Sequence, residues 1–304
     1  MSSHLPNAPI AARIVKAMRA QKTANVVDFS AFKAGREHAE EMQQSMVTPA
    51  QLEGYYPGHA AYVVAQNWAS IMVETLTSLE EAAKFAMLIS AADEAYVPQG
   101  PPMSPITGSC FFMWAAFDAA VGLRHETLGN IMLAVGAQSG IDATTLRLVG
   151  AMQASAMRVY SAASGGSNSI AMLRDLLTGD VVAAHVPTDR PIKQPELWLV
   201  RVLPPVREGE LAIAMTTPYV LQGADESAWR AYFQRALGAA AATPAKTQAA
   251  LKFRIDWLEY IFAAYVGDSF DAVSLTGIPD QPGTLPHYSA FHPLARFGRG
   301  PKKK

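Results

Sequence analysis

The stretch from Met157 to Leu221 constrains the fold most, because this part of the chain reads as β-structure. Five runs rich in Val, Leu, Ile and aromatic residues follow one another: Met157–Ser164, Ser169–Leu176, Asp180–Pro187, Glu196–Pro205 and Glu210–Leu221. Short segments with Gly, Asn and Pro separate the runs, and Gly and Asn adopt the positive φ angles that tight hairpins need. Five short strands joined by turns predict a small antiparallel barrel, either SH3-like or OB-like.

Helical patterns flank this predicted barrel. Residues 1–156 predict an all-α region of about six to eight helices, interrupted by a Pro-rich loop at 97–109. Residues 223–270 predict C-terminal helices, in the segments Asp225–Ala240 and Pro244–Val266, that pack back on the N-terminal region. Residues 271–304 are Pro-rich and basic, and predict a mostly extended tail. The expected fold class is therefore α+β, with the barrel at residues 157–222 between two helical parts.

Composition sets broad limits on function. Half of the 304 residues are hydrophobic and 17% are charged, which is enough apolar surface for a packed core. The formal net charge of −1 gives no general attraction to nucleic acid or to an anionic membrane. The single cysteine, Cys110, excludes an intrachain disulfide and a cysteine-based zinc site. We therefore expect a protein of the reducing cytoplasm, with no cofactor and no membrane-spanning segment.

The first twenty or so residues carry basic side chains but no continuous apolar core, so they do not predict a secretory signal. Ile10 and Ile14 lie on one helical face together with small and apolar neighbours. That pattern permits a transit peptide, and it is also what an N-terminal helix docked on a core shows. We favour the docked helix.

The sequence MRVYSAASGGSNSIAMLRDLLTGDVVAAHV, from Met157 to Val186, resembles a small β-module of uncharacterised bacterial proteins. In those proteins a strand, the hexapeptide RDLLTG (here Arg174–Gly179) and an acidic residue recur. Some of them also carry an SEC-C metal-binding motif, whose cysteines this chain does not have. The resemblance covers residues 155–220. It implies a fold module and a bacterial origin, and it implies no catalytic residues.

Two groups of residues are candidates for binding. Arg174 and Asp175 could form a recognition pair at the rim of the barrel, whereas the structural interpretation has Asp175 accept backbone N–H groups in the following turn. Ser104 and Thr107 place hydroxyl groups in the Pro-rich loop before a helix, where free N–H groups could hold an anion. The alternative for these hydroxyls is an ordinary helix N-cap.

Asp118, His125 and Glu126 are the candidate catalytic residues if the chain is an enzyme. Asp118 is a carboxylate inside an apolar stretch, and a buried carboxylate needs a partner, which Arg124 or His125 could supply. Such an acid–base set would suit proton transfer. The alternatives are a structural ion pair for Asp118 and a place in the first turn of a helix for Glu126.

Metal binding and thiol chemistry have one candidate each. His38 and Glu41 are three residues apart on a predicted helix, so both could reach one metal ion, but no second such pair is present and a solvated face is favoured. Cys110 follows a predicted helix start, where a thiolate could be activated. A buried, inert cysteine is the commoner arrangement.

The leading hypothesis is a non-catalytic bacterial interaction or regulatory protein that binds a protein partner through the barrel and the Pro-rich loop. One alternative is a small-molecule or metal-dependent enzyme with its site between the helical region and the barrel. Another is a nucleic-acid binder that uses the basic tail Arg296–Lys304, although the predicted barrel holds equal numbers of basic and acidic residues. Substrate, partner, oligomeric state and the presence of catalysis stay open, and a homo-oligomer is compatible with the sequence.

Overall fold

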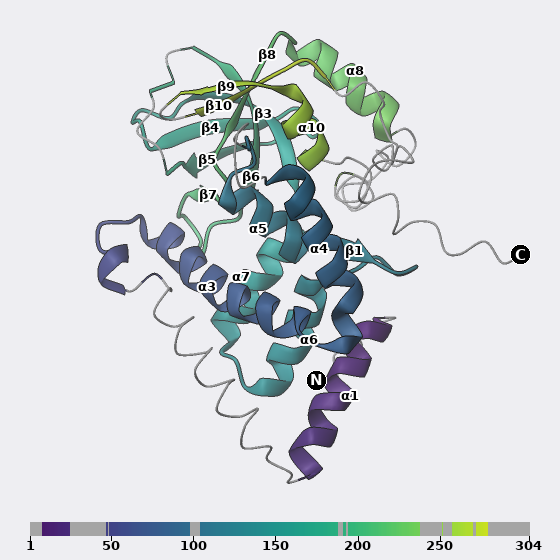
Figure 1. Ribbon diagram of the computed structural model, residues 1–304. Coiled ribbons are helices and arrows are strands. Elements are labelled where there is room, and N and C mark those ends of the chain that lie inside the picture. The colour runs from purple at the N-terminus through teal and green to yellow at the C-terminus, as the bar shows by residue number, and fades with distance from the viewer. Residues whose placement is uncertain are drawn as a thin grey trace, which may run out of the picture.

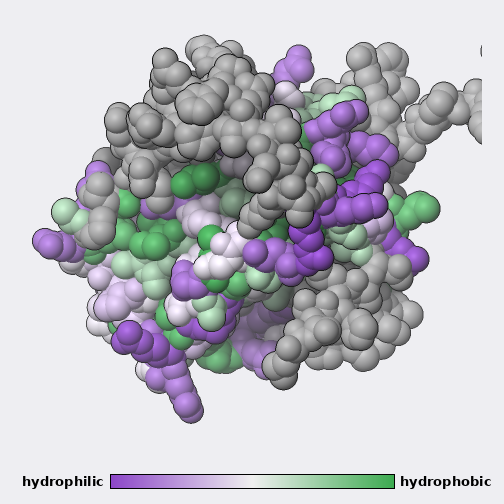
Figure 2. Space-filling view, turned by 90° about the horizontal axis from the view of Figure 1, so that it is seen from below, coloured by the Kyte–Doolittle hydropathy of each residue, from purple (hydrophilic) through white to green (hydrophobic). Residues whose placement is uncertain are grey.

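A computed structural model describes residues 8–24, 47, 49–97, 104–187, 191–192, 194–237, 251, 257–269 and 272–278. In Figure 1 a β-barrel with its attached strands lies above a region of packed helices, and the N-terminal helix lies at the end of that region farthest from the barrel. Figure 2 shows that helical end from below, with hydrophobic and hydrophilic residues interspersed over it. Among the described residues, no helix combines the length and the apolar character needed to cross a membrane.

The helical region comes before the barrel in the chain. Its α-helices are α1 (Pro9–Ala24), α3 (Pro57–Thr77), α4 (Ala83–Tyr96), α5 (Gly108–Phe117), α6 (Leu128–Ser139) and α7 (Ala143–Ala154), with 3₁₀ turns η1 (Pro49–Leu52) and η2 (Glu80–Ala82) and a hairpin of β1 (Ala120–Val121) and β2 (Glu126–Thr127). These helices enclose one apolar core, to which α1 contributes Ile10 and Ile14. The docked-helix interpretation of the N-terminus is confirmed.

Local capping chemistry fixes several helix starts. Thr107 and Asp142 accept backbone N–H groups at the starts of α5 and α7, and Thr127 with Asn130 forms a capping box on α6. The place in the first turn of a helix expected for Glu126 is wrong, because Glu126 lies in β2 and α6 begins at Leu128.

The expected barrel is confirmed, with one difference in strand direction. Its strands are β3 (Met157–Ser164), β4 (Ile170–Asp175), β5 (Val181–His185), β6 (Glu196–Leu203) and β7 (Ala212–Ala214). Around the barrel they follow the order β3-β4-β5-β7-β6, and β6 pairs with β3 to close it. The barrel is mixed rather than antiparallel, because β5 pairs with β7 in parallel, whereas β7 pairs with β6 antiparallel. The sequence predicted either an SH3-like or an OB-like barrel, and this Greek-key strand order is that of the OB-like barrel.

The two faces of each barrel strand have different environments, because successive side chains point to opposite sides. The inward face packs as a small core of its own, with Tyr160, Leu173, Trp198 and Val200 among its buried members. The outward face of β3 and β6 packs against helices. This alternation decides which of the charged residues in the barrel face its interior.

The fifth predicted run, Glu210–Leu221, forms two strands rather than one. Between β7 and β8 (Tyr219–Gln222) the regular pairing with β6 is interrupted at Arg201, whose carbonyl accepts the backbone N–H of Met215 at 2.9 Å while its own backbone N–H donates to the hydroxyl of Thr216 at 3.0 Å. The side-chain acceptor replaces one rung of the ladder, and Pro218 has no N–H to restore it. Beyond this interruption β8 pairs antiparallel with β6 again, and its other edge pairs in parallel with β10 (Ala272–Thr276).

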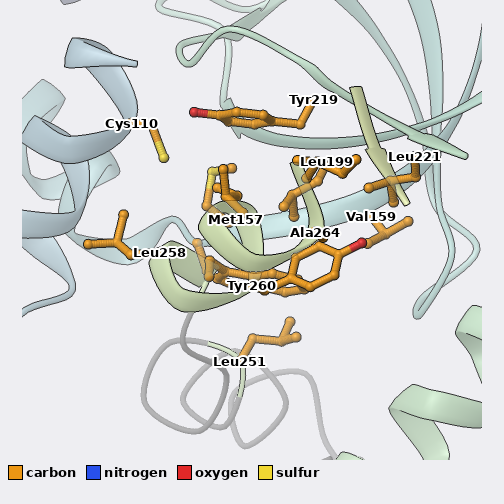
Figure 3. Close-up of a cluster of buried hydrophobic side chains, with 14 of the residues drawn as sticks. Cys110, Met157, Val159, Leu199, Tyr219, Leu221, Leu251, Leu258, Tyr260 and Ala264 are labelled. Atoms are coloured by element: carbon orange, nitrogen blue, oxygen red, sulfur yellow. The ribbon is translucent and has the colours of Figure 1, made fainter. Parts of the chain in front are cut away.

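The C-terminal part differs from the expected helices and tail. Helices α8 (Glu226–Leu237) and α10 (Trp257–Ala264) are present, but the chain then forms β9 (Tyr265–Ser269) and β10, which extend the sheet beyond the barrel. Both C-terminal helices contribute to a second apolar core that also contains residues of the barrel strands and of α4 and α5. Figure 3 shows part of this core, in which Tyr260 and Ala264 of α10 lie near Val159 and Leu199, whereas Leu258 of the same helix lies on the side of Cys110. The C-terminal helices therefore pack on both the barrel and the N-terminal region.

Candidate functional site: a pocket at the mouth of the barrel

The helical region and the barrel meet where α7 ends and β3 begins, and an arginine joins them there. Arg201, on the outward face of β6, is fully buried. Its guanidinium donates to the carbonyl and the hydroxyl of Ser155, at 3.1 and 3.0 Å, and forms an ion pair with Asp118 at the end of α5. One side chain thus connects β6 to the C-terminal ends of two helices. A buried charge pair of this kind is costly to break, because the remaining charge would be buried alone.

A second arginine pair lies on the opposite face of the neighbouring strand. Arg158 of β3 has the same orientation as Tyr160, toward the barrel interior, and donates to Asp175 of β4 at 2.5 Å. The other carboxylate oxygen of Asp175 accepts the backbone N–H groups of Leu177 and Thr178, at 2.8 and 3.2 Å. Arg158 is more accessible than Arg201, with 19% of its side chain exposed.

A pocket of about 260 Å³ opens beside this second pair, and we call it the barrel-mouth pocket. Its wall consists of Ala151, Ala154, Ser155, Ala156, Arg158, Tyr160, Val202 and Pro204. The alanines belong to the end of α7 and to the link that follows it, whereas Arg158, Tyr160 and Val202 come from the inward faces of β3 and β6. The pocket therefore lies between the helical region and the end of the barrel that faces α7.

Neighbouring contacts hold the wall of the pocket in place. The carbonyl of Pro204 accepts the hydroxyl of Tyr62 on α3 at 2.8 Å, which fixes the segment after β6. Burial raises the pKa of Tyr160 far above its usual value, and the negative charge of Asp175 raises it further. The phenol of Tyr160 therefore stays protonated and can donate a hydrogen bond. The wall of the pocket thus combines the polar residues Ser155, Arg158 and Tyr160 with apolar ones.

The three candidate catalytic residues have separate partners. Asp118 is in the ion pair with Arg201, and both carboxylate oxygens of Glu126 accept backbone N–H groups from the first turn of α1, at 3.1 Å. His125 lies exposed at the tip of the β1–β2 hairpin with φ 51°. The charge partner of Asp118 is thus a distant arginine that the sequence did not suggest. A joint acid–base role of the three stays a prediction.

The four candidate binding residues take part in internal contacts. Arg174 pairs with Glu226 of α8 at 2.6 Å, and Asp175 caps the turn after β4, as the structural interpretation predicts. Ser104 bonds to the carbonyl of Tyr96, and the backbone N–H of Thr107 donates to the hydroxyl of Tyr219 at 3.0 Å. These contacts fasten the end of the Pro-rich loop to α4 and β8. A recognition role for the four residues stays a prediction.

His38, Glu41 and the basic tail 296–304 lie outside the described residues. Within the part of the chain that the structure describes, no group of three or more His, Cys, Asp or Glu side chains is placed to hold a metal ion. Cys110 is buried beside Tyr219, as Figure 3 shows, and burial raises the pKa of its thiol to about 11. The thiol is therefore protonated at neutral pH and matches the inert alternative.

A third contact between the two regions involves histidines. His59, in the first turn of α3, lies 5.5 Å from His185 at the end of β5, measured between ring centroids, and Tyr56 stacks on His185 at 5.0 Å. Burial lowers the pKa of His59 to about 4, with a contribution from His185, and burial lowers the pKa of His185 too. Both imidazoles are neutral near pH 7.

The sequence analysis did not select Arg158, Tyr160 or Arg201. A signal for the first was available: in the strand Met157–Ser164, strict alternation puts Arg158 on the same face as Tyr160 and Ala162. A charged residue on the apolar face of a strand needs a partner or an opening, and here it has both. No such pattern identifies Arg201, because a strand covered on both faces has no polar side.

Comparisons with known proteins identify no relative of this chain. No protein-family model matches it, and neither the curated proteins nor the solved structures contain a match. The resemblance of residues 155–220 to a bacterial β-module therefore stays a prediction.

Proposed function

We propose that this chain is a non-catalytic regulatory protein that binds a small molecule in the barrel-mouth pocket. The observation that carries the proposal is the pocket itself, which lies at the junction of two packed units and has both polar and apolar residues in its wall. Ligand sites prefer such places, including the mouths of barrels, and combine apolar surface with a few fixed polar groups. The proposal keeps the regulatory character expected from the sequence and moves the binding surface away from Ser104, Thr107, Arg174 and Asp175.

Ligand binding at this place would act on the junction. The pocket wall includes Ala151 and Ala154 from α7 and Tyr160 and Val202 from the barrel, so a bound molecule contacts both units at once. A ligand that binds only the folded junction stabilises it by mass action, by about 2.7 kcal/mol at a concentration one hundred times the Kd. A change in the rigidity of the junction is the signal that a partner protein would detect.

A fragment screen by ligand-observed NMR on the full chain tests this proposal. Ala154→Phe places an aromatic side chain at an exposed position in the pocket wall, and Ala143→Phe makes the same change at the exposed start of α7, away from the pocket. We expect compounds that bind the wild type and Ala143→Phe but not Ala154→Phe, and that raise the Tm. The proposal is wrong if no compound binds the wild type, or if binding is the same in both variants.

A further inference from the structure

We infer that His59 and His185 form an acid-sensitive switch at a second contact between the helical region and the barrel. When these imidazoles take up protons, the first turn of α3 separates from the barrel while the rest of the fold stays intact. Neither histidine lines the barrel-mouth pocket, so the switch does not depend on a ligand there.

The start of α3 reaches the barrel through contacts of a few side chains. The ring of His59 lies 5.5 Å from that of His185 at the end of β5, and Tyr56, immediately before the helix, stacks on His185 at 5.0 Å. The hydroxyl of Tyr56 also accepts the backbone N–H of Leu211, just before β7, at 2.8 Å. The two histidines therefore lie in the middle of a contact between elements that are far apart in the chain.

The nitrogens of the two rings have no acceptors for added protons. An imidazolium carries two N–H groups, so it needs two acceptors. Among the described residues, the Nδ1 atoms of His59 and His185 are both buried without a hydrogen-bond partner. A protonated ring at either position would bury an N–H group with no acceptor, which is unfavourable. Once the ring moves out to solvent, the same N–H group bonds to water.

The position of the pair also disfavours positive charge. His59 lies in the first turn of α3, where the helix dipole places partial positive charge, and the next charged side chain along the helix is Glu74, about four turns further on. Burial, with a contribution from His185, lowers the pKa of His59 to about 4, and burial lowers the pKa of His185 as well. Opening therefore becomes more favourable as the pH falls below the ordinary imidazole value of 6.5.

The neighbours of the pair in the sheet and before the helix supply no compensating negative charge. Tyr55 and Tyr56 contact the two imidazoles, and a phenol is uncharged in acid. Across the sheet, the backbone of His185 pairs with Ile170 of β4 and Ile213 of β7, which are both apolar. A proton on either imidazole therefore meets aromatic and aliphatic side chains.

The acidic residues of the adjoining segments do not pair with the two histidines. Glu53, before α3, and Glu208, before β7, are exposed. The carboxylate of Glu210 accepts the backbone N–H of Arg207 at 3.3 Å and lies 3.9 Å from its guanidinium. Asp189 lies outside the described residues. In the described part of the chain, no ion pair includes either histidine.

Hydrogen exchange at single amides of the full-length protein, followed from pH 7 to pH 4.5, tests the switch. The amide of Leu211 reports the contact, because it donates to Tyr56, and the amide of Leu176, which donates to the carbonyl of Val159 at 3.0 Å, reports the barrel. After correction for the intrinsic exchange rate, we expect the protection of Leu211 to fall roughly 50-fold, from the difference between the two pKa values of His59. The protection of Leu176 should stay nearly constant.

The double variant His59→Gln, His185→Gln has no titrating ring at this contact and should keep the protection of Leu211 nearly constant over the same pH range. His125→Gln is the matched control, because His125 lies exposed at the tip of the β1–β2 hairpin, and it should behave as the wild type. A loss at Leu211 that persists in the double variant, or that is matched at Leu176, overturns the switch. So does a wild-type protection that does not change with pH.

NMR of the imidazoles in the wild type decides the question if the double variant does not fold. We expect the ring of His59 to be neutral at pH 6.5 and to take up its proton at lower pH, where Leu211 loses protection. A ring of His59 that is half-protonated at pH 6.5, as a free imidazole is, overturns the switch. None of these outcomes changes the result of the fragment screen with Ala154→Phe, so the switch and the proposed function can fail separately.

Discussion

The two sides of the β3–β6 pair carry the same kind of ion pair in different surroundings. On the outward side, Arg201 and Asp118 are sealed between the barrel and two helices, and Arg201 is fully buried. On the inward side, Arg158 and Asp175 lie at the end of the barrel beside a pocket, with Arg158 partly exposed. The first pair joins two units and the second borders a space. The comparison teaches that access, rather than residue type, separates a structural arginine from one that can meet a ligand.

The largest effect is expected at the sealed pair. Arg201→Met removes the charge that compensates Asp118 and all three side-chain bonds to the helix ends, so we expect a loss of about 3–5 kcal/mol in unfolding free energy. Urea unfolding followed by circular dichroism measures it. The double variant Arg201→Met, Asp118→Leu removes both charges and should recover much of the loss. A loss below about 1 kcal/mol in the single variant would contradict a structural role for the pair.

A titration with acid distinguishes the contribution of the Arg201–Asp118 ion pair to stability from that of the histidine contact between α3 and β5. The pKa of His59 is about 4 in the folded protein and 6.5 in the unfolded chain, so the unfolded state binds more protons between these values. The contribution of the neutral His59 to the unfolding free energy is complete above pH 6.5. It is lost as the pH falls toward 4, and the loss is at most roughly 3 kcal/mol for this one group. The lowered pKa of His185 makes the unfolding free energy fall with decreasing pH in the same way.

Unfolding free energy measured between pH 7 and pH 4 checks this prediction. His59→Gln should flatten the decrease with pH, whereas the double variant Arg201→Met, Asp118→Leu, which leaves no charge alone at the junction, should keep the slope of the wild type. A slope unchanged in His59→Gln would mean that other groups dominate the acid response.

A smaller effect on stability is expected at the open pair. Arg158→Met should cost about 1–3 kcal/mol, because Asp175 keeps its two backbone N–H donors and the side chain of Arg158 is partly exposed to water. A stability loss as large as that of Arg201→Met would erase the difference between the two pairs.

The smallest effect is expected at a third pair, which serves as a surface reference. Arg174 and Glu226 have 39% and 36% of their side chains exposed. Exposed pairs contribute about 0–1 kcal/mol, and less as salt increases. Arg174→Met should therefore lie within that range in urea unfolding and approach zero in 1 M NaCl. A loss comparable to that of Arg158→Met would show that α8 depends on this contact more than its exposure indicates.

The local part of the fold was readable from the sequence. The run Met157–Ser164 forms β3 with both ends as expected, and the turn glycines Gly166 and Gly179 have φ of 96° and 81°. Turn chemistry and alternation act over a few residues, so a single sequence contains them. The helix-to-strand change at Tyr265 was missed because β9 is short and pairs only with β10, whose other partner, β8, lies far away in the chain.

What the sequence by itself determined is the α+β class, the barrel between helical parts and the local caps and turns, since each depends on neighbours along the chain. Only the tertiary structure decided which carboxylate each arginine meets: Arg201 and Asp118 are 83 residues apart, and the strand register that turns Arg158 inward brings Asp175 beside it. The pocket is likewise a property of how α7 meets the barrel. Packing and register select among contacts that local propensity leaves equal, and for that reason the candidate site emerged from the structure.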